Sequence, residues 1–349
     1  MLRTEHERCS SVRSSRRSSR RAWAALAPAA LAAGVALALV VAGCGGTDGG
    51  TAGDTPSSPA GGTSASAAAS PAPSVVQAAP VQHVKVGDLK VGYRTIGPFG
   101  AAADSTPLLM IIGSSGTMDE WSPQLVEALA QGREVVVFDN RGMGETDDPG
   151  GAYQFSQLAD DTAGLIKALG NEKMDVMGWS MGGDVALDLA VRHPQVVNRL
   201  VSYAGAAGGS KAVPMSKKTL AVLTDTSGTA EQRGMRLLKL LFPEAYRKAN
   251  PAYAASFPIP TEQVSPAAIE RQNQAIGEWK GVWSGLQGIT APTLFVTGAE
   301  DVIAPAENAT LMAEVVPGAE LVSVPGAGHG LMYQDPQKLA DVVMDFLDQ

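Results

Sequence analysis

Cysteine is scarce in this sequence, with 2 residues among 349. Cys9 and Cys44 are too few for a disulfide scaffold, and their spacing is not that of a zinc site. Positive charge is also scarce, because 27 lysines and arginines face 35 acidic residues, for a formal net charge of −8. This balance argues against a nucleic-acid-binding surface. The length suffices for one large domain or two ordinary ones, and the chain contains no internal repeats.

Charge is absent from residues 22–43, which are mostly Ala, Leu, Val and Gly. The preceding stretch holds seven arginines against two glutamates, so residues 1–43 carry a charge of +5 and the remainder carries −13. A basic stretch followed by an apolar one is typical of a secretory signal peptide. We therefore predict that residues 1–43 are a signal peptide. The residues after Arg16 and Arg17 lack the apolar character of a twin-arginine signal, which favours the general secretory route.

The apolar stretch ends in Val-Ala-Gly-Cys at residues 41–44, which resembles the lipobox of bacterial lipoproteins. The resemblance implies cleavage before Cys44 and acylation of its thiol, which would anchor the protein to the outer face of the bacterial cell membrane. Two alternatives stay open. An uncleaved anchor helix is one, since about 20 apolar residues can span a bilayer. An ordinary signal peptide followed by an unmodified cysteine is the other.

Residues 45–80 are dominated by Gly, Thr, Ser, Ala and Pro, and Asp48 and Asp54 are their only charged residues. Such a segment cannot bury enough apolar surface to offset the entropy of ordering it. We predict a flexible linker over residues 44–80, with the lipidated cysteine at its start and the folded domain over residues 81–349.

Short apolar runs alternate with helical patterns from residue 81 onward. We expect a hairpin at 81–86 and 89–96, strands at 108–112, 134–138, 173–177, 200–203, 292–297 and 320–324, and helices at 122–131, 155–169, 181–193, 305–315 and 336–347. This alternation predicts an α/β fold with a mostly parallel sheet. Residues 206–288 break the rhythm, with helical patches at 235–241 and 267–276, and we expect a helical lid there.

A G-x-S-x-G pattern, Gly-Trp-Ser-Met-Gly at residues 178–182, joins an expected strand to an expected helix. On a sharp turn between these elements the hydroxyl of Ser180 is exposed, as a nucleophile requires. An ordinary surface serine in a tight turn is the alternative. From about residue 89 to its C-terminus, the domain resembles the α/β-hydrolase family. The resemblance implies a catalytic triad in the chain order Ser, Asp or Glu, His.

Three histidines follow the predicted signal peptide, at positions 83, 193 and 329. His193 precedes a proline at the end of a helix, where its charge complements the helix dipole. His329 lies in a glycine-rich loop, Gly-Ala-Gly-His-Gly at residues 326–330, after the last expected strand. The family's catalytic histidine occupies this position, so the resemblance assigns His329 as the general base.

The acid of the triad is expected between the serine and the histidine. Residues 297–305 resemble the family's G-x-x-D-x-x-x-P signature, which assigns Asp301 as the residue that orients His329. Glu300 is its nearest rival, and a plain turn residue before Pro305 is the alternative role for Asp301. The strand that ends at Tyr203 is followed by no carboxylate, so the other location used by some relatives is empty.

Acyl transfer also needs two backbone N–H donors directed at the developing oxyanion. We expect them at Met181 and in the loop at residues 113–121, with Ser114 as first choice and Ser115 as second. Ile112 stands where many relatives have a histidine that supports this loop. Residues 139–146 resemble the family's D-x-R-G-x-G-x-S/T loop, which supports its neighbours and in which a catalytic role for Asp139 or Arg141 is the lesser alternative.

These features predict an exported, membrane-anchored serine hydrolase that cleaves a small-molecule carboxylic ester without a metal or other cofactor. Other chemistry of the fold stays open, namely a cofactor-free perhydrolase, a carbon–carbon bond hydrolase or an aminopeptidase. A catalytically idle lipoprotein that binds a ligand is the alternative of a different class. Substrate preference and oligomeric state cannot be read from the sequence. Six aromatic residues of the lid line an acyl pocket or build a helical core: Phe242, Tyr246, Tyr253, Phe257, Trp279 and Trp283.

Overall fold

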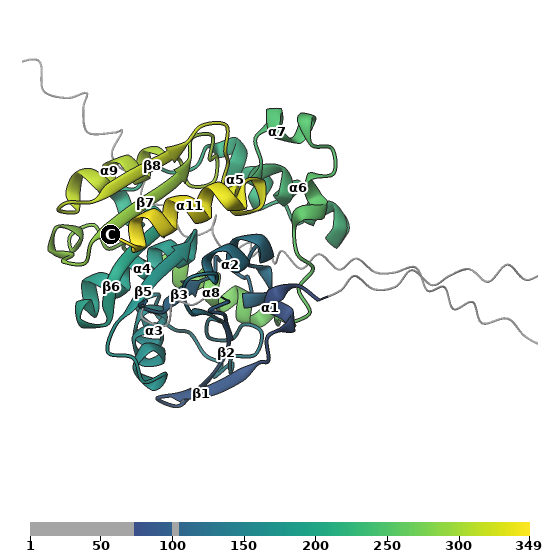
Figure 1. Ribbon diagram of the computed structural model, residues 1–349. Helices are drawn as coiled ribbons and strands as arrows, with labels where there is room; N and C mark the ends of the chain where they lie inside the picture. Colours follow the sequence, from purple (N-terminus) through teal and green to yellow (C-terminus); the bar gives the residue numbers. More distant parts are fainter. Residues whose placement is uncertain (1–72, 100–104) are drawn as a thin grey trace, which may run out of the picture.

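The computed structural model describes residues 73–99 and 105–349, and a central sheet organises them (Figure 1). Eight strands follow the order β1-β2-β4-β3-β5-β6-β7-β8. Their bounds are β1 (Gln82–Val86), β2 (Leu89–Ile96), β3 (Leu108–Ile111), β4 (Val135–Phe138), β5 (Met174–Trp179), β6 (Val197–Tyr203), β7 (Thr293–Gly298) and β8 (Glu320–Val324). The hairpin of β1 and β2 and the pairing of β2 with β4 are antiparallel, and all other pairings are parallel. The predicted mostly parallel sheet is thereby confirmed.

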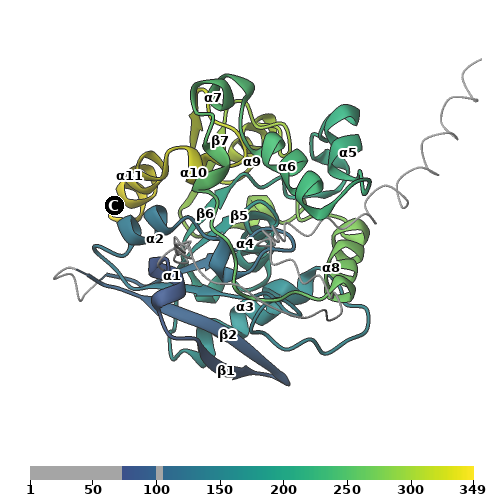
Figure 2. The same cartoon turned by 90° about the vertical axis from the view of Figure 1, so that its right-hand side faces the viewer.

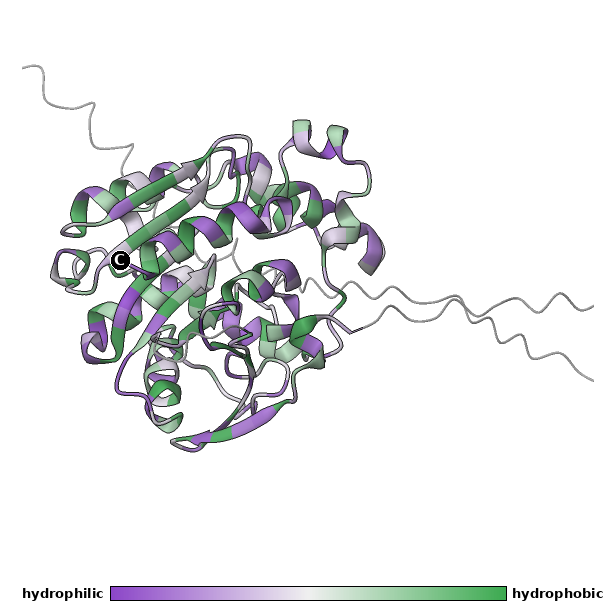
Figure 3. Ribbon diagram, viewed as in Figure 1, coloured by the Kyte–Doolittle hydropathy of each residue, from purple (hydrophilic) through white to green (hydrophobic). Residues whose placement is uncertain are grey.

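The central strands are buried on both faces. Every residue of β3, β4, β5 and β7 is buried, whereas the edge strands β1 and β8 alternate between exposed and half-buried residues. Continuous apolar runs are the pattern of a parallel sheet that helices cover on both sides. Figure 3 shows this arrangement as largely hydrophobic strands surrounded by helices that are hydrophobic on one side and hydrophilic on the other.

Helices cover the two faces of the sheet and form two apolar clusters with it. One face carries α1 (Val75–Ala78), α2 (Pro123–Leu129), α10 (Leu331–Gln334) and α11 (Pro336–Leu347), and the other carries α3 (Ser156–Ala168), α4 (Met181–Arg192) and α9 (Glu307–Val315). The starts of α2 and α11 follow from local chemistry. The side chains of Ser122 and Asp335 accept backbone N–H bonds there, and a proline follows each.

The described structure begins before residue 81, where we expected the folded domain to start. Ser74 and Gln77 form a capping box around α1, and Val76 is fully buried. The guanidinium of Arg94 donates to the carbonyl oxygens of Val76, Gln77 and Ala79. The apolar contact and these bonds order the segment, although its composition resembles that of the linker. The predicted signal peptide, Cys44 and the linker up to residue 72 lie outside the described residues.

Residues 206–288, which we call the cap, leave the sheet after β6 and return to it before β7. The cap holds α5 (Lys217–Leu223), α6 (Ala230–Leu241), α7 (Glu244–Ala249) and α8 (Pro266–Glu278). The described residues also form short 3₁₀ helices inside and outside the cap: η1 (Met118–Glu120), η2 (Pro194–Val196), η3 (Gly209–Lys211), η4 (Tyr253–Ser256) and η5 (Leu286–Gly288). Figure 1 shows α5, α6 and α7 grouped at the upper right and α8 below them, and in Figure 2 α8 lies below α5 and α6. Among the helices of the described residues, none is long and apolar enough to cross a bilayer.

Candidate active site

Ser180 occupies a strained turn between β5 and α4. Its backbone has φ 56° and ψ −123°, a conformation that residues with a side chain rarely adopt. The turn is also crowded. A Cβ atom at Gly178 would lie 2.0 Å from the carbonyl oxygen of Gly182, and one at Gly182 would lie 2.0 Å from that of Ile111. The two glycines of the motif are therefore steric requirements of the turn that presents Ser180.

His329 lies in the loop after β8 and is held beside this turn. Its Nδ1 atom is 2.7 Å from Oδ2 of Asp301, and both side chains are buried. The carbonyl oxygen of His329 accepts a bond of 3.1 Å from Trp179 Nε1 and one of 2.7 Å from the hydroxyl of Tyr203. The imidazole and the indole of Trp179 have ring centroids 5.4 Å apart. Because Trp179 precedes Ser180, these contacts hold the loop that carries His329 against the turn that carries Ser180.

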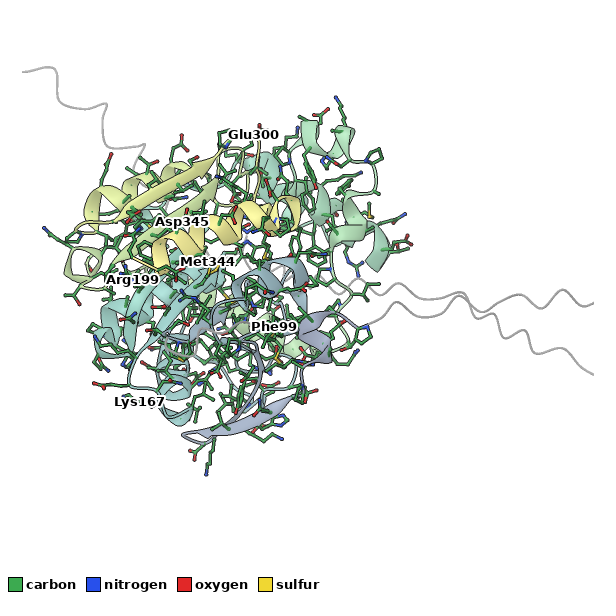
Figure 4. All side chains as sticks on the ribbon, viewed as in Figure 1. Phe99, Lys167, Arg199, Glu300, Met344 and Asp345 are labelled. Atoms are coloured by element: carbon green, nitrogen blue, oxygen red, sulfur yellow. The ribbon has the colours of Figure 1, made fainter. Side chains whose placement is uncertain are left out.

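The two carboxylate oxygens of Asp301 have different hydrogen-bond partners, one in its own loop and one on the histidine. Oδ1 accepts backbone N–H bonds from Ile303 (2.8 Å) and Ala304 (2.9 Å), which leaves Oδ2 directed at His329. Glu300, the rival in the sequence, has an exposed side chain at the edge of the molecule in Figure 4. The structure therefore brings Asp301 to the imidazole, and it does not bring Glu300 there.

Among the described residues, the hydroxyl of Ser180 has no hydrogen-bond partner. Hydrogen bonds between nucleophile and base are often long in the absence of substrate and tighten when it binds. The other two histidines have partners away from this site. His193 Nε2 lies 2.7 Å from Asp160 Oδ1, and His83 Nε2 lies 3.5 Å from Glu145 Oε2.

The loop after β3 passes directly over the serine. A Cβ atom at Gly113 would lie 3.4 Å from Cβ of Ser180 and 3.2 Å from Cε3 of Trp179. The backbone N–H of Ser115 donates to Gln272 Oε1 at 2.6 Å, whereas those of Ser114 and Met181 have no acceptor within the part of the chain that the structure describes. The geometry therefore favours Ser114 over Ser115 as the partner of Met181.

Apolar packing supports the start and the end of this loop. Ile112, Met118 and Trp121 are fully buried and belong to one cluster of the core. The loop thus begins and ends on buried apolar side chains, and Ile112 anchors its first residues without a polar group.

Asp139 holds two loops together and does not contact the histidine. Its Oδ1 accepts from the backbone N–H of Met118 at 2.7 Å, and its Oδ2 accepts from that of Glu145 at 2.8 Å. Burial raises the pKa of Asp139 well above its usual value. Arg141 forms a bidentate pair with Asp161 on α3. The loop at 139–146 therefore supports its neighbours, as the resemblance implied.

Sequence reasoning missed four residues that shape the site. Trp179 and Tyr203 bind the carbonyl group of His329, and Gln272 binds the loop over Ser180. Asp184, in the first turn of α4, accepts the backbone N–H groups of Ala206 and Ala207 at the start of the cap. Burial raises the pKa of Asp184 to about 6. The place of Trp179 inside the motif was a usable signal in the sequence. No sequence signal marks Gln272, because its partner Ser115 lies 157 residues away along the chain.

The aromatic residues of the cap pack mainly against one another and against the core. Phe242 stacks on Tyr246 and meets Tyr253 edge to face, with centroid distances of 5.5 and 5.4 Å. Trp279 stacks on Phe155 of the core at 4.1 Å. These contacts match the expectation of a helical core better than that of an acyl pocket. In the described ranges no cluster of three His, Cys, Asp or Glu side chains could hold a metal ion.

Comparisons with known proteins agree with this architecture. The family model described as "alpha/beta hydrolase fold" matches residues 106–336. The protein named "Putative carbamate hydrolase RutD" from Caulobacter sp. (strain K31) is 30% identical over 263 residues, which cover 71% of this chain and 92% of that protein. The 2-hydroxymuconate semialdehyde hydrolase of Pseudomonas sp. (strain CF600) is 28% identical over 258 residues, 69% of this chain and 86% of its own.

A solved structure extends the likeness to three dimensions. The thermophilic esterase from Thermogutta terrifontis superposes with a TM-score of 0.64 at 22% identity, over 77% of this chain and 98% of that one. At this identity the likeness concerns the fold alone. The match to the family model and the relative at 30% identity show that this chain belongs to the alpha/beta hydrolase fold family.

Proposed function

We propose that the protein is a serine hydrolase that cleaves carboxylic esters through an acyl-enzyme. One observation carries the proposal. The hydrogen-bonded pair of Asp301 and His329 is fixed by Trp179 beside a serine in a strained turn. Strain of this kind persists only where the surrounding structure maintains it, and it is concentrated at functional sites.

The mechanism follows from the roles that these groups can take. Ser180 Oγ attacks the ester carbonyl while His329 Nε2 accepts its proton, and Asp301 stabilises the resulting imidazolium. The backbone N–H groups of Met181 and Ser114 bind the oxyanion. His329 then protonates the departing alcohol, and a water molecule activated by the same histidine hydrolyses the acyl-enzyme. Apart from the substrate and this water molecule, each step uses only groups of this chain.

The names of the relatives support a second candidate reaction. One relative is named for a carbamate and another for 2-hydroxymuconate semialdehyde, so hydrolysis of a carbonyl compound other than an ester is the alternative. The two reactions are compatible with the same fold, because one fold hosts many chemistries. Turnover of esters and carbamates with the same leaving group decides between them.

Export and membrane anchoring through acylated Cys44 form part of the proposal. The basic start, the apolar stretch and the lipobox-like residues 41–44 support them. In a bacterial host fed an alkyne-labelled fatty acid, the full chain should incorporate label, and Cys44→Ser should not. Equal labelling of both proteins would contradict the lipoprotein assignment.

The nucleophile is tested with Ser180→Ala in the full chain. We expect turnover of p-nitrophenyl butyrate to fall by about 10⁴-fold or more, and labelling by a fluorophosphonate probe to disappear. Ser210→Ala is the matched control, because Ser210 is an exposed serine of the cap. Retained turnover and labelling in Ser180→Ala would overturn the proposal. A wild-type protein that reacts with neither reagent would favour the idle ligand-binding lipoprotein.

A further inference from the structure

Gln272 of α8 reaches from the cap into the loop over Ser180. Its side chain is fully buried, and its Oε1 lies 2.6 Å from the backbone nitrogen of Ser115 and 3.3 Å from Ser114 Oγ. A backbone N–H can only donate, so the amide oxygen of Gln272 must face Ser115. The orientation of the amide is therefore determined by its surroundings.

The nitrogen of this amide has no hydrogen-bond partner among the described residues. Gln272 Nε2 is buried, and no acceptor among the described residues binds it. The covalent geometry of an amide keeps its nitrogen about 2.3 Å from its oxygen, so Nε2 lies beside the same loop. Gly113, in that loop, lies close to Ser180, because a Cβ atom added at Gly113 would be 3.4 Å from Cβ of Ser180. Buried donors are rarely left unpaired, because the loss of hydration is then uncompensated.

We propose that Gln272 is a substrate-positioning residue, an inference that rests on the proposed hydrolase function. Its Oε1 holds Ser115, which leaves the N–H of Ser114 for the oxyanion. Its Nε2 donates a hydrogen bond to a second acceptor oxygen of the substrate, close to the carbonyl that Ser180 attacks. The preferred substrate class is an ester with an ether, keto or carboxyl oxygen near the reacting carbonyl, in preference to a plain alkanoyl ester.

The packing of the cap supports this substrate class. Phe242, Tyr246 and Tyr253 contact one another, and Trp279 stacks on Phe155. One contact that the cap makes with the loop over Ser180 is the polar amide of Gln272, which binds the backbone N–H of Ser115. A site with a buried donor discriminates against a ligand that lacks the matching acceptor, because the donor then stays unpaired.

The test compares two esters of the same length, p-nitrophenyl methoxyacetate and p-nitrophenyl butyrate, which differ by an oxygen in place of one methylene. Each kcat/KM is divided by the rate constant of the same ester with hydroxide, which removes the intrinsic difference in reactivity. We expect the wild-type protein to prefer the methoxyacetate by about tenfold after this correction, as one buried hydrogen bond provides.

Gln272→Met preserves the length of the side chain and removes the hydrogen bonds of Oε1 with Ser115 and Ser114 as well as the proposed bond from Nε2 to the substrate. We expect the corrected preference to fall to about one. In addition, kcat should fall for both esters with less change in KM, because the loop that binds the oxyanion loses its support at Ser115. Gln274→Met is the matched control, since Gln274 is an exposed residue of the same helix bonded to Glu278, and it should preserve the preference.

Several outcomes would overturn the inference. A Gln272→Met protein that slows both esters equally and keeps the preference would show that Gln272 only supports the loop. A wild-type protein without the corrected preference would contradict the inference, whether or not the variant folds. If the fluorophosphonate probe labels Ser180 and the preference is absent, this inference alone fails. If Ser180→Ala retains turnover, the proposed function fails with it.

Discussion

The turn at Ser180 and the cap both contribute to one site, but they are held by contacts of different range. The turn depends on residues 178–182 and on the end of the neighbouring strand β3, because a Cβ atom at Gly178 would meet the carbonyl oxygen of Gly182 and one at Gly182 would meet that of Ile111. The cap reaches the same site through side chains more than a hundred residues away in sequence, such as Gln272 on Ser115. A short glycine motif packed against one strand thus determines the turn at the serine, and contacts from the distant cap determine what surrounds it.

The cap is also attached to the core by buried charges. Arg94 lies 3.2 Å from Asp119 and 3.0 Å from Glu262 of the cap, and all three side chains are almost completely buried. Thr261 adds two hydrogen bonds to Asp119, at 2.9 Å from its backbone nitrogen and 2.6 Å from its hydroxyl. Since Arg94 also binds three carbonyl oxygens around α1, one guanidinium joins the sheet, the cap and the first helix.

The largest expected effect concerns the pair of Asp301 and His329 beside the turn at Ser180. Asp301→Asn replaces the acceptor that faces His329 Nδ1 with a donor and so favours the wrong imidazole tautomer. We expect kcat for p-nitrophenyl butyrate to fall by about 10⁴-fold with little change in stability. Glu300→Gln, at the exposed neighbouring position, should leave kcat near the wild-type value. Comparable losses in both variants would contradict the assignment of Asp301.

Arg94→Met tests how the cap is attached to the core. Removal of the guanidinium leaves Asp119 and Glu262 as buried carboxylates without a countercharge, and we expect the free energy of unfolding to fall by about 3–5 kcal/mol. Urea unfolding followed by tryptophan fluorescence measures this change. Arg233→Met is the control, because Arg233 is a less buried residue of the cap that donates to the carbonyl oxygens of Thr226 and Gly228. A similar loss in both variants would show that the buried charges do not attach the cap.

A smaller effect depends on pH. Burial raises the pKa of Glu120 to about 8. Between its unfolded pKa and this folded value, the folded state binds more protons than the unfolded state, so stability falls as pH rises. From pH 6 to pH 8 we expect this group to remove about 2 kcal/mol from the free energy of unfolding.

Glu120→Gln removes that titration. The free energy of unfolding of the variant, relative to that of the wild-type protein, should therefore rise by about 2 kcal/mol from pH 6 to pH 8. The free energies come from urea unfolding at each pH. Glu127→Gln, an exposed position on α2, should follow the wild-type pH dependence. Parallel curves for Glu120→Gln and the wild-type protein would refute the role of Glu120.

Much of the core was predictable because its signals are local. The limits of β2, β8 and α11 agree with the expected ranges, since apolar runs, turn residues and a capping aspartate define them. The pairing of Asp301 with His329 was expected from two motifs in separate loops, and the structure brings these side chains to 2.7 Å. Helix α1 was not predicted, because its stability depends on Arg94 and on burial of Val76, neither of which is visible in its composition.

The sequence by itself determined the order of strands and helices along the chain, the glycine motif around Ser180 and the two motifs that contain Asp301 and His329. These features depend on periodicity, glycine placement and short motifs, which act over a few residues. Only the tertiary structure decided that Gln272 binds the loop over the serine and that Arg94 joins the cap to the core. Those contacts depend on the path of the cap across the sheet, which many long-range interactions determine together.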